Sequence, residues 1–173
     1  SVVLLIIDGS VGCTGTLINN TDNDGKPYLL TASHCLNKQF TMKNPDYEKI
    51  AGSIVCFFNF NSPFCDPILR GTEEMSTAST YFKAVNEMAD MALLELTATP
   101  PVYYRPYYAG WNAQEVGPAP YTCIQHPQYS VKRISISDEE LAPFTLTDPN
   151  MIFYEDAHWH VKTWEVGYTA SGS

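Results

Sequence analysis

The residues of this chain that could do chemistry begin with one histidine beside a cysteine. A short apolar stretch, residues 28–30, leads into the small-residue turn Thr31-Ala32-Ser33-His34-Cys35, which presents a single imidazole. A histidine in such a turn could take and return a proton in a hydrolytic reaction. A partly buried histidine next to a disulfide fits the same stretch, so other residues must decide between the two.

A carboxylate and a Gly/Ser segment could complete a catalytic site around His34. A histidine that activates a serine needs a carboxylate to fix its tautomer and stabilise its charged form. Asp90 precedes the apolar run 91–96, where an acid is costly unless it has a partner, although it could also simply cap a turn. The final stretch, 167–173, is Gly-Tyr-Thr-Ala-Ser-Gly-Ser. It could expose a hydroxyl and aim backbone N–H groups at an oxyanion, or it could be a frayed tail.

A second pair of histidines carries a weaker signal. His158 and His160 flank Trp159, and alternation along a strand would place both imidazoles on one face. With Glu155 or Asp156 they could bind zinc, but no further spaced His or Cys ligands accompany them. We therefore expect a surface pair, and neither a metal site nor any other cofactor.

Composition indicates a globular chain and excludes two classes of partner. Hydrophobic residues make up 45% of the 173 residues and charged residues only 17%, which excludes a disordered chain. The net charge of −9 repels phosphate backbones and anionic lipids, so we expect no nucleic-acid or membrane partner. Five cysteines, many aromatic residues and only ten Lys and Arg favour a secreted protein whose disulfides support a core.

Short β-type segments separated by turn residues predict an all-β fold. Asp24-Gly25 predicts a tight turn that joins two strands into a hairpin, with Cys13 and Cys35 near its ends, where a disulfide would clamp the turn that carries His34. His126 is expected in a loop. The expected strands cover residues 2–7, 12–19, 28–31, 53–60, 78–85, 91–96, 121–125, 132–136, 151–155 and 158–164.

A proline-rich connector suggests two parts. Three prolines fall within residues 99–106 and favour an extended segment over sheet or helix. We therefore expect an N-terminal β-barrel over residues 1–98, a Pro/Tyr-rich connector over 99–108 and a partial C-terminal β-barrel over 109–173.

The order His, Asp, Ser on an all-β chain resembles the chymotrypsin-fold, trypsin-like serine endopeptidases, and most closely the bacterial lysyl endopeptidases. The resemblance implies two antiparallel β-barrels, His34 as general base, Asp90 as its orienting carboxylate and a Cys13–Cys35 disulfide. It also implies a secreted or extracellular bacterial enzyme, with the cell surface and the periplasm as alternative locations, that cuts peptide bonds through an acyl-enzyme after Lys or other basic residues. The segments that carry the resemblance are Cys13-Thr14-Gly15-Thr16-Leu17-Ile18-Asn19-Asn20-Thr21, Leu30-Thr31-Ala32-Ser33-His34-Cys35, Asp90-Met91-Ala92-Leu93-Leu94-Glu95-Leu96, Ala109-Gly110-Trp111, His126-Pro127 and Lys132-Arg133-Ile134-Ser135.

The resemblance leaves the nucleophile open. The family motif reads Gly-Ser-Ser-Gly-Ser-Pro, and its second serine is the nucleophile. If Gly172-Ser173 matches the first two residues, Gly172 is the oxyanion-hole glycine and the nucleophile is the residue directly after Ser173, so Ser173 marks its place in the sequence. We favour this alignment, because it keeps the spacing from Gly167-Tyr168-Thr169 and the oxyanion-hole glycine. If Ser171-Gly172-Ser173 matches the last Ser-Gly-Ser, the nucleophile is Ser171. On either alignment the remaining strands of the second barrel lie outside the sequence, so a truncated second barrel is expected.

Three cysteines lack an assignable partner in this interpretation. The family cysteine that matches Cys65 bonds to one upstream of the first residue, so Cys56, Cys65 and Cys123 have no assignable partners, and the odd count leaves at least one thiol free or bonded outside the sequence. We expect a monomer that acts on a peptide or protein substrate. The alternative is a catalytically inactive homologue that binds peptides in the groove between the barrels, and a structural β-sandwich is a third possibility.

Overall fold

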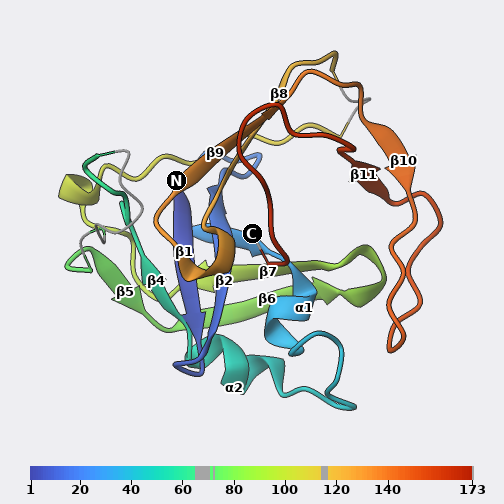
Figure 1. Ribbon diagram of the computed structural model, residues 1–173. Coiled ribbons are helices and arrows are strands. Elements are labelled where there is room, and N and C mark those ends of the chain that lie inside the picture. The colour runs from blue at the N-terminus through green and yellow to red at the C-terminus, as the bar shows by residue number, and fades with distance from the viewer. Residues whose placement is uncertain (65–70, 72, 114–116, 173) are drawn as a thin grey trace.

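The computed structural model describes residues 1–64, 71, 73–113 and 117–172, and its regular structure is mostly β (Figure 1). The prediction of an all-β, trypsin-like fold is confirmed. Among the described residues, no helix is long and apolar enough to span a membrane. The strands are β1 (Val2–Ile7), β2 (Val11–Ile18), β3 (Tyr28–Thr31), β4 (Val55–Phe57), β5 (Ser76–Ala78), β6 (Thr80–Asn86), β7 (Met91–Leu96), β8 (Tyr121–Gln125), β9 (Arg133–Ser137), β10 (Ala142–Phe144) and β11 (His158–His160). The helices are α1 (Ser33–Leu36), α2 (Tyr47–Gly52) and the 3-10 turns η1 (Glu87–Ala89), η2 (Val102–Tyr104) and η3 (Pro127–Tyr129).

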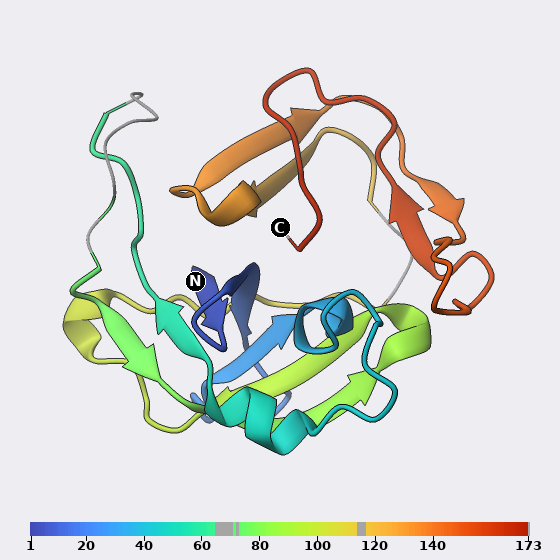
Figure 2. The same cartoon turned by 60° about the horizontal axis from the view of Figure 1, so that its bottom comes forward.

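Seven strands form one curled antiparallel sheet in the order β5-β4-β1-β2-β3-β7-β6 (Figures 1 and 2). Side chains alternate along each strand, so every second residue of β2 and β7 points into the concave side. Leu5, Leu17, Leu29 and Leu94 are fully buried there and pack into one core. Burial of these leucines fixes the strand register, because a slip of one residue would turn each of them toward water.

The predicted hairpin of β2 and β3 is confirmed, but its turn is not the expected tight Asp-Gly turn. The strands pair from Thr16 opposite Leu30 to Ile18 opposite Tyr28, and a nine-residue loop, 19–27, joins them. Asn23 and Gly25 adopt the left-handed backbone, with φ of 51° and 73°. Asp24 instead uses its carboxylate, which accepts hydrogen bonds from the Asn20 amide and the Lys26 backbone. A side-chain contact therefore organises this loop.

Several expected strands are shorter than predicted or broken. Ser79, with a φ of 68°, separates β5 from β6, and Asn59, with a φ of 52°, follows the end of β4. The strand expected over 151–155 is wrong: Met151 makes one isolated bridge to Asp148, and Tyr154 donates its backbone N–H to Met88 instead of to a strand. The strand expected over 158–164 ends at residue 160, and β10, its partner, was not predicted.

Two small two-stranded sheets accompany the large sheet, and the β8–η3 part lies against the face of β1 and β2 opposite the leucine core, where Leu4 clusters with Val131 and Thr14 contacts His126. β8 pairs with β9 and β10 pairs with β11, both antiparallel. Figure 2 shows both sheets arching above the seven-stranded sheet, with the C-terminal residues running down between them. The connector contributes to the packing of the large sheet, since Tyr104 is buried against Phe58. The division into two barrels at residues 99–108 stays a prediction.

Candidate active site

The sheet topology brings His34 and Asp90 to the same edge. β3 and β7 are antiparallel, with Thr31 opposite Ala92, so the end of β3 lies beside the start of β7. His34 follows β3 on the single helical turn α1, and Asp90 directly precedes β7 at the end of η1. The two predicted residues therefore meet although 56 positions separate them in sequence.

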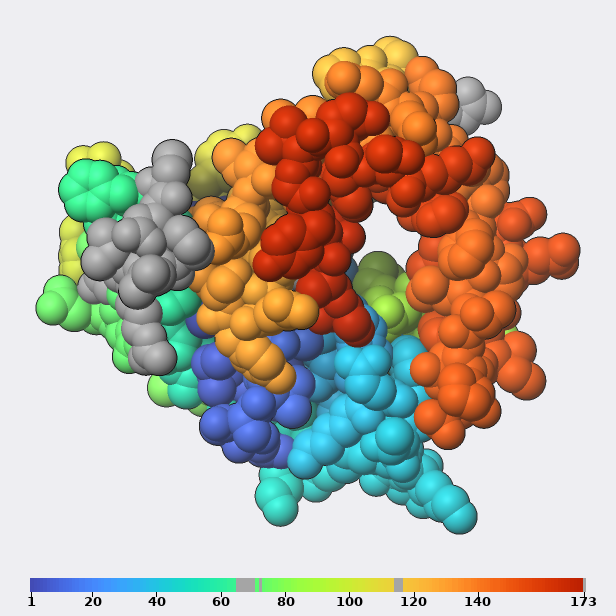
Figure 3. Space-filling view, viewed as in Figure 1, coloured from blue at the N-terminus to red at the C-terminus, as the bar shows by residue number. Residues whose placement is uncertain are grey.

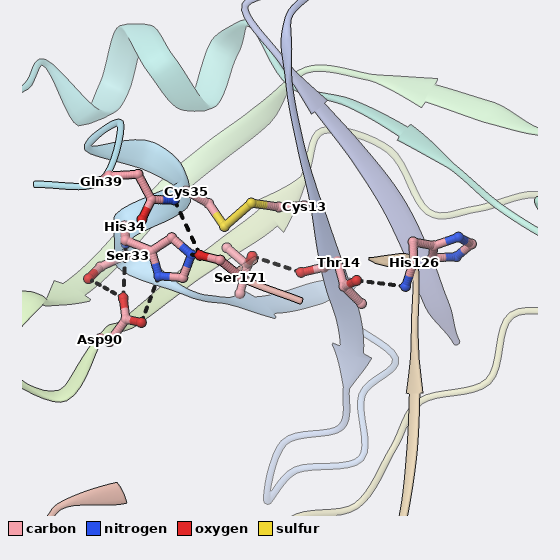
Figure 4. The surroundings of a disulfide bond; sticks show 10 residues. Cys13, Thr14, Ser33, His34, Cys35, Gln39, Asp90, His126 and Ser171 are labelled. Atoms are coloured by element: carbon pink, nitrogen blue, oxygen red, sulfur yellow. Dashed lines mark hydrogen bonds and ion pairs between the residues drawn. A yellow bond between two sulfur atoms is a disulfide. The ribbon is translucent and has the colours of Figure 1, made fainter. Parts of the chain in front are cut away.

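Asp90 contacts both the ring and the backbone of His34 (Figure 4). One carboxylate oxygen, Oδ2, lies 2.7 Å from His34 Nδ1. The other, Oδ1, accepts hydrogen bonds from the His34 backbone N–H at 2.9 Å and from the Ser33 hydroxyl at 3.0 Å. Burial by itself would raise the pKa of Asp90, but these hydrogen bonds outweigh it, so the pKa lies below its ordinary value. Asp90 is therefore an anion at neutral pH, and it favours the tautomer of His34 with its proton on Nδ1.

The conformation of Asp90 is itself unusual for a residue other than glycine. Its φ of 49° and ψ of 46° place it in the left-handed region, which aspartate tolerates better than most residues. Both side chains are shielded, with 11% of the His34 and 13% of the Asp90 side-chain surface exposed. A left-handed residue at such a site must be held by its surroundings.

The C-terminal segment brings Ser171 to the far side of the imidazole. Ser171 Oγ lies 3.4 Å from His34 Nε2, and the Gln39 side-chain amide lies 3.4 Å from the same hydroxyl. Figure 3 shows the C-terminal residues in red reaching the light-blue segment that contains α1, beside a hollow bordered by orange residues of the β10–β11 arm. Ser173, the other predicted serine, lies outside the described residues.

Gly172 lets the C-terminal segment pack closely against the Cys13 and Cys35 sulfurs. Its carbonyl accepts a 2.7 Å hydrogen bond from the Thr14 backbone N–H. Its φ is 77°, and a Cβ at this position would lie 2.7 Å from Cys13 Sγ and 3.6 Å from His34 Nε2. Only glycine combines this backbone with this close approach.

The predicted pair Cys13 and Cys35 forms a disulfide that joins β2 to α1. Both cysteines are buried, so the bond anchors the turn that carries His34 to the core of the sheet. The two sulfurs and a ring nitrogen of His34 lie within 4.8 Å of one another, the spacing of a metal site. Because the sulfurs are bonded to each other, they are not available as thiolate ligands.

The other histidine pair is not part of this site, although the rings of Phe153 and Phe40 lie between His158 and His34. The His158 ring packs edge-on against Phe153, with 5.8 Å between ring centroids, and the His160 ring packs against Phe144 at 4.8 Å. His160 is exposed and His158 half-buried, and in the described part of the chain no acidic residue joins them in a group of donors.

His126 plays a structural role that the sequence did not reveal. It does lie outside the strands, but it is a buried residue and not a surface one, since its exposed fraction is only 2%. Its backbone N–H donates to Thr14 Oγ1 at 2.9 Å, and its Nδ1 contacts the Ser130 carbonyl at 3.0 Å. Burial, helped by the nearby charge of Lys132, lowers its pKa to about 4. Thr14 thus contacts both the β8–η3 junction and, through Gly172, the C-terminal segment (Figure 4).

The free thiols are poor nucleophiles. Cys56 is buried, which raises its pKa to about 12, and burial also raises the pKa of Cys123. A nucleophilic cysteine needs a lowered pKa, so neither thiol replaces the serine. Cys65 lies outside the residues that the structure describes.

The comparisons with known proteins identify the family of this chain. The family model described as "Lysyl endopeptidase, C-terminal domain" matches residues 1–173. A lysyl endopeptidase of Pseudomonas aeruginosa is 27% identical over 129 residues, which are 73% of this chain and 26% of that relative. The chain therefore spans about a quarter of the length of this curated relative. The chain belongs to the lysyl endopeptidase family, within the chymotrypsin-fold serine endopeptidases.

Proposed function

We propose that this chain carries the catalytic residues of a serine endopeptidase that cuts peptide bonds through an acyl-enzyme. The observation that supports this most directly is the alignment of Asp90, His34 and Ser171, with contacts of 2.7 Å and 3.4 Å on the two ring nitrogens. A carboxylate on one nitrogen and a hydroxyl on the other is the arrangement that activates a serine. A distance of 3.4 Å without substrate suits such a pair, because these contacts shorten once substrate binds.

In this mechanism His34 moves a proton twice. Nε2 takes the proton of the serine hydroxyl as Oγ attacks the carbonyl carbon of the peptide bond, and a tetrahedral oxyanion forms. His34 then gives the proton to the leaving amine, and the acyl-enzyme remains. Water, activated in turn by His34, hydrolyses the acyl-enzyme and restores the serine. Throughout, Asp90 stays ionised, holds the ring and stabilises its charged form.

Ser171 is the nucleophile in this proposal. It offers the hydroxyl that faces His34 Nε2, and Gly172 gives the segment the sharp turn that a nucleophile loop needs. Ser173 and a residue directly after it are the alternatives. They follow from the first alignment of the family motif, and a mapped adduct separates all three.

Substrate and location are also part of the proposal. The relative's name, lysyl endopeptidase, supports cleavage after lysine or other basic residues, and the net charge of −9 attracts cationic substrates. The Cys13–Cys35 disulfide supports an oxidising, extracellular location. The enzyme then acts as a monomer on peptide or protein substrates.

The test is a serine-directed phosphonate applied to the full-length protein that contains this chain, followed by mass spectrometry of the labelled peptide. We expect one adduct on Ser171, loss of the adduct in Ser171→Ala and in His34→Ala, and wild-type labelling in Ser10→Ala, which removes an exposed serine from the turn between β1 and β2. An adduct on Ser173 or the next residue would move the nucleophile but keep the mechanism. A protein that takes no adduct and cuts no lysyl peptide would overturn the proposal and favour a peptide-binding homologue.

A further inference from the structure

We propose that Glu87 is a positioning residue for the triad: with Asn37 and Tyr47 it holds η1 against α1, so that Asp90 meets His34. Asn37 and Tyr47 supply the hydrogen bonds, and Glu87 receives both. The inference rests on the proposed function, since it concerns the same His34–Asp90 pair.

A second contact runs parallel to the one between His34 and Asp90. Asn37 lies three residues after His34, at the end of α1, and Glu87 lies three residues before Asp90, at the start of η1. The Asn37 side-chain amide donates to Glu87 Oε1 at 2.6 Å. Asp90 therefore joins the end of η1 to the start of α1, and Glu87 joins the start of η1 to the end of α1.

Asn37 is well placed to hold this contact. Its exposed fraction is 3%, so water does not compete for its side chain. Its backbone N–H donates to the Ser33 carbonyl at 3.0 Å, and its Oδ1 accepts the Met42 backbone N–H at 3.0 Å. With both ends of the amide engaged, Asn37 presents its N–H₂ group to Glu87 in one orientation.

Tyr47 adds a donor from a third element. Its hydroxyl, on α2, donates a short hydrogen bond to the same Oε1 of Glu87. The Tyr47 ring stacks on Phe82 of β6, with 5.3 Å between centroids and 12° between the ring planes. Burial raises the pKa of Tyr47, and Glu87 raises it further, so the hydroxyl remains a donor at neutral pH. Glu87 thus ties α1 and α2 to η1.

The backbone transmits this contact to Asp90. Glu87 and Asp90 close the same 3-10 turn, because the Asp90 N–H donates to the Glu87 carbonyl at 3.0 Å. The Asn86 side chain accepts the Ala89 N–H at 3.2 Å and completes the turn. A single turn of three residues has little stability of its own, and Asp90 leaves it in the left-handed region. Release of Glu87 would let η1 move and would lengthen the contact between Asp90 and His34.

The experiment compares Glu87→Ala and Glu87→Gln with Glu48→Gln in the full-length protein. Glu48 is an exposed glutamate next to Tyr47, so its variant controls for the loss of a carboxylate in the same region. Two quantities are measured: kcat and KM on a lysyl peptide, and the downfield ¹H resonance of the His34 Nδ1 proton. That resonance reports the hydrogen bond to Asp90 in the folded protein, which a change in overall stability alone would not move.

We expect kcat of Glu87→Ala to fall about 10- to 100-fold, the loss typical of a catalytic group displaced by about 1 Å, with KM within about two-fold of wild type. The resonance should shift upfield or broaden. Glu87→Gln keeps an oxygen acceptor for Asn37 and Tyr47 and should lose less in both measurements, and Glu48→Gln should match the wild type. If Glu87→Ala does not fold, Tyr47→Phe, which removes one donor, should show the same effects more weakly.

Two outcomes separate this inference from the proposed function. A wild-type resonance and a wild-type kcat in the Glu87 and Tyr47 variants would overturn the positioning role while the triad stands. A shifted resonance in a protein that never cleaves peptides would support the positioning role and overturn the proposed function.

Discussion

Asp90 receives hydrogen bonds from both the ring and the backbone N–H of His34, through its two separate oxygens, at 2.7 and 2.9 Å. The backbone contact fixes where α1 begins, and the ring contact fixes how the imidazole is turned. One carboxylate therefore sets both the position and the tautomer of the candidate base.

Asp90→Asn should remove the tautomer control and leave the fold intact. An asparagine amide would donate to Nδ1 and drive the ring proton to Nε2, which could then no longer accept from serine. We expect kcat to fall about 10⁴-fold with little change in KM. Steady-state kinetics on a lysyl peptide measures this, with Asp22→Asn in the exposed 19–27 loop as the control. A variant that keeps a tenth of the wild-type kcat would contradict the assigned role.

Gly172→Ala should disable the site through a clash. The φ of 77° is strained for alanine, by about 1 to 3 kcal/mol, and the new methyl group would lie 2.7 Å from Cys13 Sγ. The segment must then shift away from His34, so we expect labelling by the phosphonate to slow by about ten-fold or more.

Gly25→Ala is the matched control for that variant. Gly25 has a similar φ of 73°, but a methyl group added to it would meet nothing within 4 Å, so it carries the backbone strain without the clash. Rates of phosphonate labelling and thermal unfolding midpoints of both variants separate the effect of the clash from that of backbone strain. Equal labelling rates in the two variants would show that Gly172 does not seat the nucleophile segment.

His126 should make stability depend on pH between about 4 and 6.5. Burial lowers its pKa in the folded state to about 4, while the unfolded chain keeps the ordinary value near 6.5. In this window the unfolded state binds a proton that the folded state does not, so the free energy of unfolding falls as the pH falls. The loss between pH 7 and pH 4 should reach about 3 kcal/mol.

Urea unfolding of the wild type and of His126→Asn over this pH range measures the effect. The variant should be less stable at pH 7, because it leaves a buried space, but its stability should lose this part of the pH dependence. His160→Asn removes an exposed histidine and should keep the wild-type slope. Parallel pH curves for the wild type and His126→Asn would contradict the prediction.

The parts of the fold that follow from local patterns could be predicted from the sequence. In β3 and β7, buried residues alternate with less buried ones, and turn residues lie at the strand ends. The order of His34 and Asp90 along the chain matched the His–Asp order of the chymotrypsin-type triad. Contacts between distant polar residues leave no such periodic trace. The hydrogen bond from Asn37 to Glu87 spans 50 positions, and no local pattern near either residue predicts it.

The lack of a local sequence pattern also explains why the burial of His126 was not predicted and why the strand expected over residues 151–155 is wrong. The burial of His126 depends on Thr14, which is 112 positions away on β2. Residues 151–155 have the composition of a strand, but within the described residues their strand pairing is limited to the bridge from Met151 to Asp148, and Ile152 stays 80% exposed. Strand propensity needs a partner edge before it produces a strand.

Thr14→Val should weaken the junction between β2 and η3 without disabling catalysis. The Thr14 hydroxyl accepts the buried His126 N–H, and valine, of nearly the same shape, would leave that donor unpaired at a cost of about 1 to 3 kcal/mol in unfolding free energy. The contact to Gly172 comes from the Thr14 backbone N–H and survives the substitution, so kcat should stay within about three-fold of wild type. Thr14→Ser keeps the acceptor and should unfold almost like the wild type. Urea unfolding and peptide kinetics on the two variants test both halves, and a Thr14→Val protein of wild-type stability, or one that loses catalysis while stable, would show that the hydroxyl does something other than hold this junction.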